Sequence, residues 1–147
     1  MSVRVQHEAF DLGAEVTAFT STLAAAGAVV TFSGLVRDEG GTLTAMDIEH
    51  YPGMTEAALT GIAKEAVTRW SLEDALVIHR HGALAPQEMI MMVATAAPHR
   101  KDAFEAAEFL MDYLKSRAPF WKREVTAEGA DWVAAKDTDE EIGRAHV

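Results

Sequence analysis

Two apolar runs that follow each other across a short turn constrain the fold of this chain most strongly. Residues 75–82 read ALVIHRHG and residues 88–97 read EMIMMVATAA, and the segment between them contains Pro86. Short apolar runs bounded by turn residues are typical of buried β-strands. The second run is nearly continuous, as in strands that are covered on both faces. The sequence therefore predicts a pair of strands, with 88–97 at the centre of a sheet.

Three other stretches repeat apolar residues at the three- and four-residue steps of an amphipathic helix. They cover residues 12 to about 25, 52 to about 70 and 98 to about 117. Asp11 is a candidate N-cap for the first helix, and Pro119 cannot continue the third. We therefore expect three helices, each with one buried face.

The remaining strand-like segments are residues 3–6, 28–37, 43–51, 120–126 and 130–135. The simplest account pairs 28–37 with 43–51, because a short, flexible segment around DEGG separates them. The absence of a repeat or a linker predicts a single domain over residues 1–147, with a loose acidic tail from about residue 137. This order of helices and adjacent strands predicts an α+β fold with a mixed, largely antiparallel sheet.

Charge and composition exclude several classes of protein. The chain carries 13 Lys and Arg against 23 Asp and Glu, a net charge of −10, so we expect no binding to nucleic acid through phosphate contacts. It has no run of about eighteen apolar residues and no signal-peptide pattern, so we expect no membrane segment and a cytoplasmic location. It also contains no Cys, which excludes disulfides, thiolate metal ligands and a cysteine nucleophile. Any sulfur chemistry must therefore use sulfur that another molecule supplies.

The basic residues gather in one segment. Six basic and four acidic residues lie between residues 100 and 123, which gives this segment a charge of +2 and leaves −12 for the rest of the chain. Such a local field suits a small anionic substrate or a carboxylate of a partner. A solvated helix face with ordinary ion pairs is the alternative. His99, Arg100 and Lys101 fall at a helix N-terminus, where cations oppose the helix dipole, and a bound phosphate would remove this conflict.

Lys115 and Lys122 flank the break at Pro119, one in the last turn of the third helix and one on the following strand. The two amines can therefore converge from two elements, and a lysine beside another cation has a reason for a lowered pKa. Two surface lysines that extend their ammonium groups into water are the alternative. Arg37 ends a strand before the DEGG segment, as residues displayed at the mouth of a site often do. An ordinary surface Arg is the alternative.

His79 and His81 alternate on one predicted strand, but no further ligand stands at a convincing spacing. We therefore expect no metal site and interpret the two imidazoles as half-buried polar groups. The motifs of phosphate loops, dinucleotide folds, α/β-hydrolases and zinc proteases are also absent from the sequence.

Three segments of the chain resemble a known family. They are GAVVTFSGLVRDEG at residues 27–40, IEHYPGMTE at 48–56 and APHRKDAFEAAEFLMDYLKSRAPFWKRE at 97–124, of which the last is the most specific. The chain is similar here, from about Gly27 to Val133, to the large, catalytic subunits of molybdopterin synthase. The resemblance implies an α/β hammerhead-type fold with a small additional sheet and no resident cofactor. It also implies a homodimer within a heterotetramer, in which each copy binds one small ubiquitin-like sulfur-carrier subunit.

The activity implied by this resemblance is that of a sulfurtransferase in molybdenum cofactor biosynthesis. Sulfur would pass from the thiocarboxylate at the C-terminal Gly-Gly of the carrier to cyclic pyranopterin monophosphate, which becomes the dithiolene of molybdopterin. By motif, Lys115 and Lys122 match the catalytic lysines of the family. Lys122 would offset oxyanion charge, and Lys115 would act either as a general acid and base or as a nucleophile. The matching substrate-binding residues are Leu35, Val36, Arg37, His99, Arg100, Arg123, Glu124 and Lys136, and Phe32 and Met111 would form an apolar wall. Arg144 has no match.

The spacing of these residues makes a further prediction. His99 and Lys115 lie on one predicted helix, so their backbones are about 24 Å apart at 1.5 Å per residue. A small pterin cannot contact both ends of such a helix. If both residues belong to one site, His99 and Arg100 must come from a neighbouring copy, so we expect a composite site across a dimer interface.

Two alternatives remain open. The basic segment can serve a non-catalytic anion-binding or adaptor subunit, in which only charge matters and Lys115→Arg keeps function. An enzyme loses activity with this change, because a guanidinium does not deprotonate. A degenerate relative that binds the carrier without chemistry is the other alternative, and the presence of all the matched basic residues argues against it.

Overall fold

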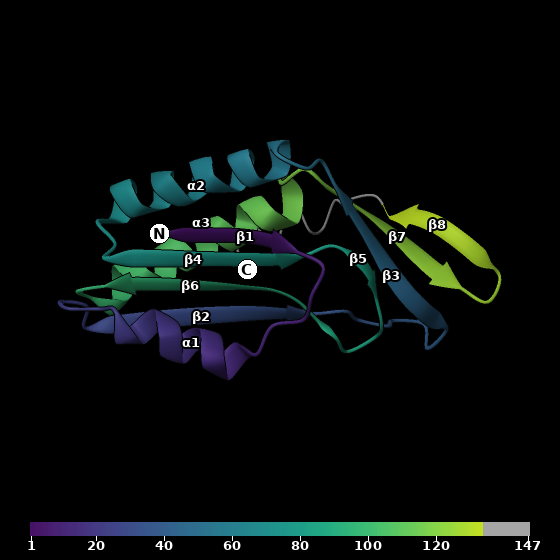
Figure 1. Ribbon diagram of the computed structural model, residues 1–147, viewed down its shortest axis with the longest axis horizontal. Helices are drawn as coiled ribbons and strands as arrows, with labels where there is room; N and C mark the ends of the chain where they lie inside the picture. The colour runs from purple at the N-terminus through teal and green to yellow at the C-terminus, as the bar shows by residue number, and fades with distance from the viewer. Residues whose placement is uncertain (134–147) are drawn as a thin grey trace.

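Two four-stranded sheets and three helices make up the fold (Figure 1). The structure is a computed structural model, and it describes residues 1–133. The elements in chain order are β1 (Ser2–Gln6), α1 (Leu12–Ser21), β2 (Ala28–Leu35), β3 (Leu43–His50), α2 (Met54–Trp70), β4 (Asp74–Arg80), β5 (Gly82–Leu84), β6 (Met89–Ala97), α3 (Arg100–Ser116), β7 (Phe120–Thr126) and β8 (Gly129–Val133). The predicted α+β class with three helices is confirmed.

The first sheet has the strand order β1-β4-β6-β2, and its two inner strands are the two apolar runs. β4 and β6 pair antiparallel, β2 is antiparallel to β6, and β1 is parallel to β4. The prediction of a buried strand pair with 88–97 in the interior of a sheet is therefore confirmed. This sheet is covered on both faces, which explains why its inner strands are almost entirely apolar.

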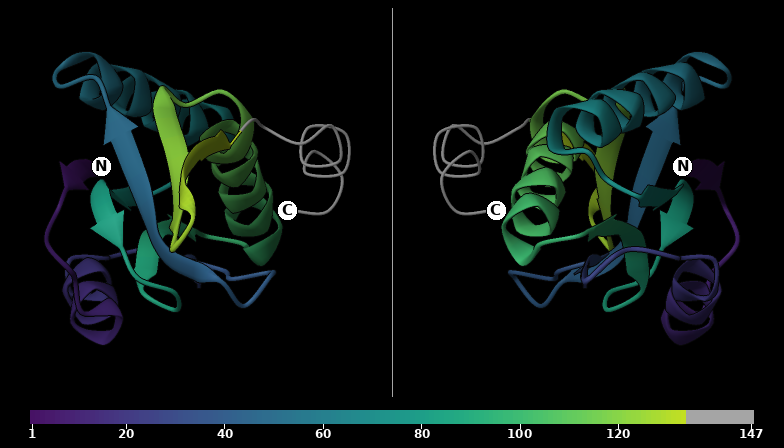
Figure 2. Two further views of the ribbon diagram at one scale, coloured as in Figure 1. Left: turned by 90° about the vertical axis from the view of Figure 1, so that its right-hand side faces the viewer. Right: turned by 90° about the vertical axis from the view of Figure 1, so that its left-hand side faces the viewer.

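The helices cover the two faces of the first sheet (Figure 2). α2 and α3 pack on one face, where Val77 and Val93 from the sheet meet Leu59 and Leu110 from the helices. α1 packs on the other face, where Phe19 lies against residues such as Ile78 of β4. Alternating side chains of one strand thus serve two separate hydrophobic clusters.

The second sheet has the order β5-β3-β7-β8 and stands at one end of the first sheet (Figure 1). Its core contains Met46, Ile48 and Leu84 together with Val36, which lies in the segment that connects the two sheets. β5 has three residues and no counterpart among the predicted strands.

The expected pairing of residues 28–37 with 43–51 is wrong. β2 pairs with β6, and β3 pairs with β5 and β7 in the other sheet. The cause lies at Val36, which is fully buried. Its N–H donates to the carbonyl of Glu88 (2.9 Å), and its carbonyl accepts from the N–H of Gln87 (2.8 Å). These bonds fix the chain after β2 to the turn before β6, so that the chain crosses into the second sheet.

The first helix is shorter than predicted and ends at Ser21. The backbone N–H groups of Ala24, Ala25 and Ala26 donate to the carboxylate of Glu73, at 2.5, 2.8 and 2.6 Å. A carboxylate that satisfies three successive N–H groups replaces the bonds of a further helical turn. The helix therefore ends before the segment whose N–H groups bind the carboxylate of Glu73, the residue that precedes β4.

No helix within residues 1–133 combines the length and the apolar composition that a membrane crossing requires. Lys136, Arg144 and the acidic segment from residue 137 onward lie outside the described residues.

Candidate active site

The turn between α3 and β7 places the two lysines. The N–H groups of Arg117 and Ala118 both donate to the carbonyl of Tyr113, at 2.8 and 2.9 Å, and thereby close the end of α3. Pro119 then prevents further helix, and the chain reverses into β7. Lys115 lies in the last turn of α3, and Lys122 is the third residue of β7. The two amines therefore approach one region from two elements.

A cavity of about 480 Å³ receives both lysines, and we call it the lysine pocket. It has three cationic groups, from Arg37, Lys115 and Lys122, and a largely apolar wall. Its lining residues are Phe32, Ser33, Gly34, Leu35, Arg37, His79, Gln87, Ile90, Met91, Met111, Leu114, Lys115 and Lys122. A cavity of this size accommodates a compact ring system. The cations suit an anionic group or an oxyanion that forms during a reaction.

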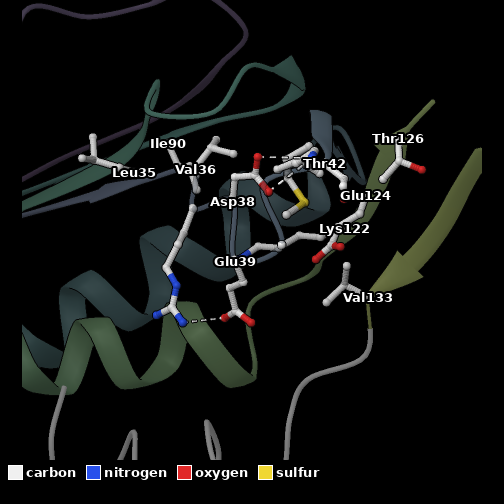
Figure 3. Close-up of a pocket in the computed structure, with 14 residues that line it drawn as sticks. Leu35, Val36, Asp38, Glu39, Thr42, Ile90, Lys122, Glu124, Thr126 and Val133 are labelled. Atoms are coloured by element: carbon white, nitrogen blue, oxygen red, sulfur yellow. Dashed lines mark hydrogen bonds and ion pairs between the residues drawn. The ribbon is translucent and has the colours of Figure 1, made fainter. Parts of the chain in front are cut away.

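A second hollow, the loop pocket, adjoins the lysine pocket and shares Leu35, Arg37, Ile90 and Lys122 with it. In Figure 3, Lys122 and Glu124 enter it from β7, while Asp38 and Glu39 line it from the segment after β2. Asp38 accepts a hydrogen bond from the N–H of Leu43 (3.2 Å), which holds this segment in place. Asp38, Glu39 and Glu124 make the loop pocket more acidic than the lysine pocket, whose lining residues include no Asp or Glu.

Arg37 reaches both pockets from the end of β2. Its side chain is 78% exposed, and its guanidinium forms an ion pair with Glu39 at 2.7 Å. Exposed ion pairs of this kind contribute little to stability. Arg37 is therefore available to a ligand at the mouth of the lysine pocket, in agreement with the expectation that it is displayed there.

Most of the predicted site residues meet in these two pockets. The lysine pocket brings together Phe32, Leu35, Arg37, Met111, Lys115 and Lys122, and the loop pocket adds Val36 and Glu124. These residues come from β2, the segment that follows it, α3 and β7. The convergence of Lys115 and Lys122, which the sequence left open, is confirmed. The roles of the individual residues stay predictions.

Three predicted residues lie elsewhere. His99 and Arg100 are exposed at the N-terminus of α3, whereas Lys115 lies in its last turn. Arg123 points to the opposite side of β7 from Lys122, where its guanidinium forms an ion pair with Asp47 (2.7 Å). Neither described pocket is lined by any of the three. None of the three therefore shares a pocket with Lys115 and Lys122.

His79 is a pocket residue to which the sequence analysis assigned no role in this site. It is 3% exposed within β4 and lines the lysine pocket. Its imidazole stacks on the ring of Phe120, with 3.8 Å between ring centroids and 17° between ring planes. A polar dipeptide, His79-Arg80, in an otherwise apolar buried strand was the signal that could have identified it.

The imidazoles within residues 1–133 form no evident metal centre. His81 lies beside His50, with 4.1 Å between ring centroids, whereas the ring of His79 stacks on Phe120. Within the part of the chain that the structure describes, no group of three or more His, Cys, Asp or Glu side chains is arranged to hold a metal ion. The expectation of no metal site stays a prediction.

Comparisons with known proteins agree with one another. The model of the family described as MoaE protein matches residues 5–117. A molybdopterin synthase catalytic subunit from Cereibacter sphaeroides is 70% identical over 140 residues, which cover 95% of this chain and 96% of that protein. The structure of the molybdopterin biosynthesis MoaE protein from Burkholderia ambifaria matches with a TM-score of 0.82 and 49% identity, over 99% of this chain and 98% of the other.

A more distant solved structure shares the fold. It is the protein-protein complex of subunits 1 and 2 of the molybdopterin-converting factor from Helicobacter pylori, which matches with a TM-score of 0.76 and 19% identity. The match covers 92% of this chain and 90% of the other.

Proposed function

The chain belongs to the MoaE protein family, and from this premise we propose that the lysine pocket is the site at which it transfers sulfur. The chain acts as the catalytic subunit of a molybdopterin synthase, an enzyme of molybdenum cofactor biosynthesis. The observation that carries the proposal is the convergence of Lys115 and Lys122, from α3 and β7, on one cavity. The chain contains no Cys, so the transferred sulfur arrives on another molecule.

The proposed sulfur donor is a small ubiquitin-like carrier subunit with a thiocarboxylate at its C-terminal Gly-Gly. A small partner subunit is supported by the Helicobacter pylori neighbour, which was solved as a complex of two subunits. The proposed acceptor is cyclic pyranopterin monophosphate, whose ring system matches the size of the cavity and whose phosphate matches its cations. We place two copies of the chain and two carriers in a heterotetramer, and a cytoplasmic location stays a prediction.

The two lysines have different proposed roles. The ammonium of Lys122 offsets the charge of the thiocarboxylate and of the tetrahedral oxyanion that develops from its carbonyl. Lys115 moves a proton as a general acid and base, or its neutral amine takes the acyl group of the carrier transiently. In the second case the carbon–sulfur bond breaks, the sulfur passes to the pterin, and water later releases the acyl group as a carboxylate. Arg37 binds the anionic part of the pterin at the mouth of the pocket.

We assign His99 and Arg100 to the site of a second copy of the chain. α3 is one continuous helix from Arg100 to Ser116, so its two ends cannot meet at one small ligand. We propose that these two residues of one copy bind the phosphate of a ligand held at Lys115 and Lys122 of the other copy. A helix N-terminus with exposed cations provides N–H groups and charge for that purpose.

A reconstituted reaction tests the proposed function. The protein, a carrier with a C-terminal thiocarboxylate and cyclic pyranopterin monophosphate are combined, and the dithiolene product is converted by oxidation to a fluorescent pterin. We expect product with the wild-type chain and none with Lys115→Ala, while Lys115→Ala still binds the carrier. A carrier that ends in an ordinary carboxylate is the matched control. Absence of product with a verified thiocarboxylate and a folded protein would contradict the proposal.

A further inference from the structure

His79 is a buried polar side chain in the middle of the active-site region, and its surroundings are unusual for an imidazole. β4 is buried along almost its whole length, and this ring is 3% exposed. One face of the ring stacks on Phe120 at 3.8 Å between centroids. A hydrophobic side chain would fill this space without the cost of burying a polar group. The structure therefore suggests a use for the ring nitrogens.

The tautomer of His79 follows from its hydrogen bond. Nδ1 lies 2.8 Å from the backbone carbonyl of Arg80, and a carbonyl oxygen can only accept, so Nδ1 carries the proton. Burial, and to a smaller extent the positive charge of Lys122, lower the pKa of His79 to about 3, against the opposing effect of that hydrogen bond. The imidazole is therefore neutral at physiological pH. Its remaining nitrogen, Nε2, carries a lone pair and can only accept.

The position of His79 relative to β7 brings it to Lys122. The ring stacks on Phe120, and Phe120 and Lys122 are two residues apart on a strand, so their side chains share one face. His79 and Lys122 line the same cavity. The charged or titratable groups that act on the ring are Lys122 from β7, His81 after β4 and His50 from β3. Lys122 is the member of this set that lines the lysine pocket with His79.

We propose that His79 is a positioning residue, whose Nε2 accepts a hydrogen bond from the ammonium of Lys122 and holds that ammonium in the lysine pocket. This inference rests on the proposed function of the pocket. A neutral acceptor orients the ammonium and leaves its positive charge undiminished. A carboxylate in the same place would neutralise that charge and repel an anionic substrate. Stacking on Phe120 fixes the orientation of the imidazole, so the lone pair of Nε2 points in one direction.

A measurement on the protein alone tests the contact. In protein labelled with ¹⁵N-histidine, NMR reports the protonation of each ring nitrogen. We expect His79 to show a protonated Nδ1 and an unprotonated Nε2 between pH 5 and pH 9. The Nε2 signal should shift in Lys122→Met and stay in place in Lys101→Met, which removes an exposed lysine at the far end of α3. An Nε2–H tautomer, or an Nε2 signal that Lys122→Met leaves unchanged, would overturn the proposal.

Kinetics test the consequence for the reaction. His79→Phe keeps an aromatic ring beside Phe120 and removes the acceptor, and we expect kcat to fall roughly 10- to 100-fold with little change in KM. His79→Gln restores an acceptor and should recover part of kcat. His7→Phe, which changes an exposed imidazole that neither lines the pocket nor is among the groups that act on His79, is the matched control and should leave kcat unchanged.

A double-mutant cycle separates positioning from packing. When Lys122 is already Ala, His79→Phe should cause no further loss, because the two residues act through one contact. An equal loss in both backgrounds, or a wild-type kcat in His79→Phe, would contradict the proposal. If His79→Phe does not fold, His79→Gln and the NMR comparison decide. Inactivity of the wild-type protein would count against the proposed function alone, since the NMR result does not depend on activity.

Discussion

Thr55 and Pro119 are joined by a hydrogen bond that ties the start of α2 to the turn between the two lysines. The Thr55 hydroxyl donates to the carbonyl of Pro119 at 3.1 Å and accepts from the N–H of Tyr51 at 3.0 Å. The side chain is fully buried. The turn that separates Lys115 from Lys122 is therefore held by a residue far away in the sequence, and its geometry depends on the packing of α2.

Replacing Thr55 by Val should weaken both the fold and the site. The change keeps the shape of the side chain but leaves the carbonyl of Pro119 and the N–H of Tyr51 without this partner, which costs about 1–3 kcal/mol of unfolding free energy. We also expect a lower kcat, because β7 loses a constraint next to Lys122. Urea unfolding and the reconstituted reaction measure the two effects. Thr17→Val on the exposed face of α1 is the matched control, and equal stability of the two variants would refute the prediction.

Glu73 should make the stability of the protein depend on pH. Hydrogen bonds from the N–H groups of Ala24, Ala25 and Ala26 lower the pKa of its carboxyl group below the ordinary value of 4.5. A lowered pKa in the folded state means that the unfolded chain binds the proton more readily. The contribution of Glu73 is thus complete above pH 4.5 and is lost as the pH falls through the folded-state pKa.

The variant Glu73→Gln tests this dependence. At neutral pH it should unfold at a lower urea concentration than the wild type, because the amide has no charge to offer the three N–H groups. The difference between the two midpoints should shrink as the pH is lowered below 4.5. Glu65→Gln, which removes a charge from the exposed face of α2, controls for net charge. A difference that stays constant from neutral to acidic pH would argue against the prediction.

Local patterns predicted the parts of the fold that local interactions determine. The ends of α2 and α3 were predicted to within a few residues. The apolar periodicity and the prolines that mark each helix lie within or next to the helix itself, so a short stretch of sequence contains the whole signal. The central pair β4 and β6 was found because each strand is itself a short apolar run, although the segment between them also contains β5, which joins the second sheet.

The errors in the predicted fold come from contacts between residues far apart in the sequence. The end of α1 is set by Glu73, and the division of β2 and β3 between two sheets is set by the bonds of Val36 with Gln87 and Glu88. The site shows the same limit. The family resemblance indicated Lys115 and Lys122, which the structure brings to one pocket, but the place of His79 in that pocket became visible only with the structure, in which β7 places Phe120 against it.

The conservative change Lys115→Arg distinguishes an enzyme from an anion-binding adaptor. Both side chains are cationic, so an adaptor that needs only positive charge should keep its affinity for the carrier and its function. A guanidinium does not deprotonate, so a lysine that transfers protons or forms an acyl bond cannot be replaced by it. We expect kcat to fall by at least about 100-fold with carrier binding retained. Wild-type turnover in the Arg variant would show that residue 115 contributes only positive charge.

A mixed dimer tests whether His99 and Arg100 serve the site of the other copy. Two tagged chains, one with Lys115→Ala and one with Arg100→Ala, are combined, and the dimers that carry both tags are purified. If the site is shared, each mixed dimer has one intact site and should recover about half of the wild-type rate. The crossed control pairs a wild-type chain with one that carries both substitutions. A shared site predicts no intact site in this control, whereas a site within one copy predicts about half the rate there and none in the first mixture. The two arrangements therefore give opposite results, and recovery in the crossed control alone would contradict the composite site.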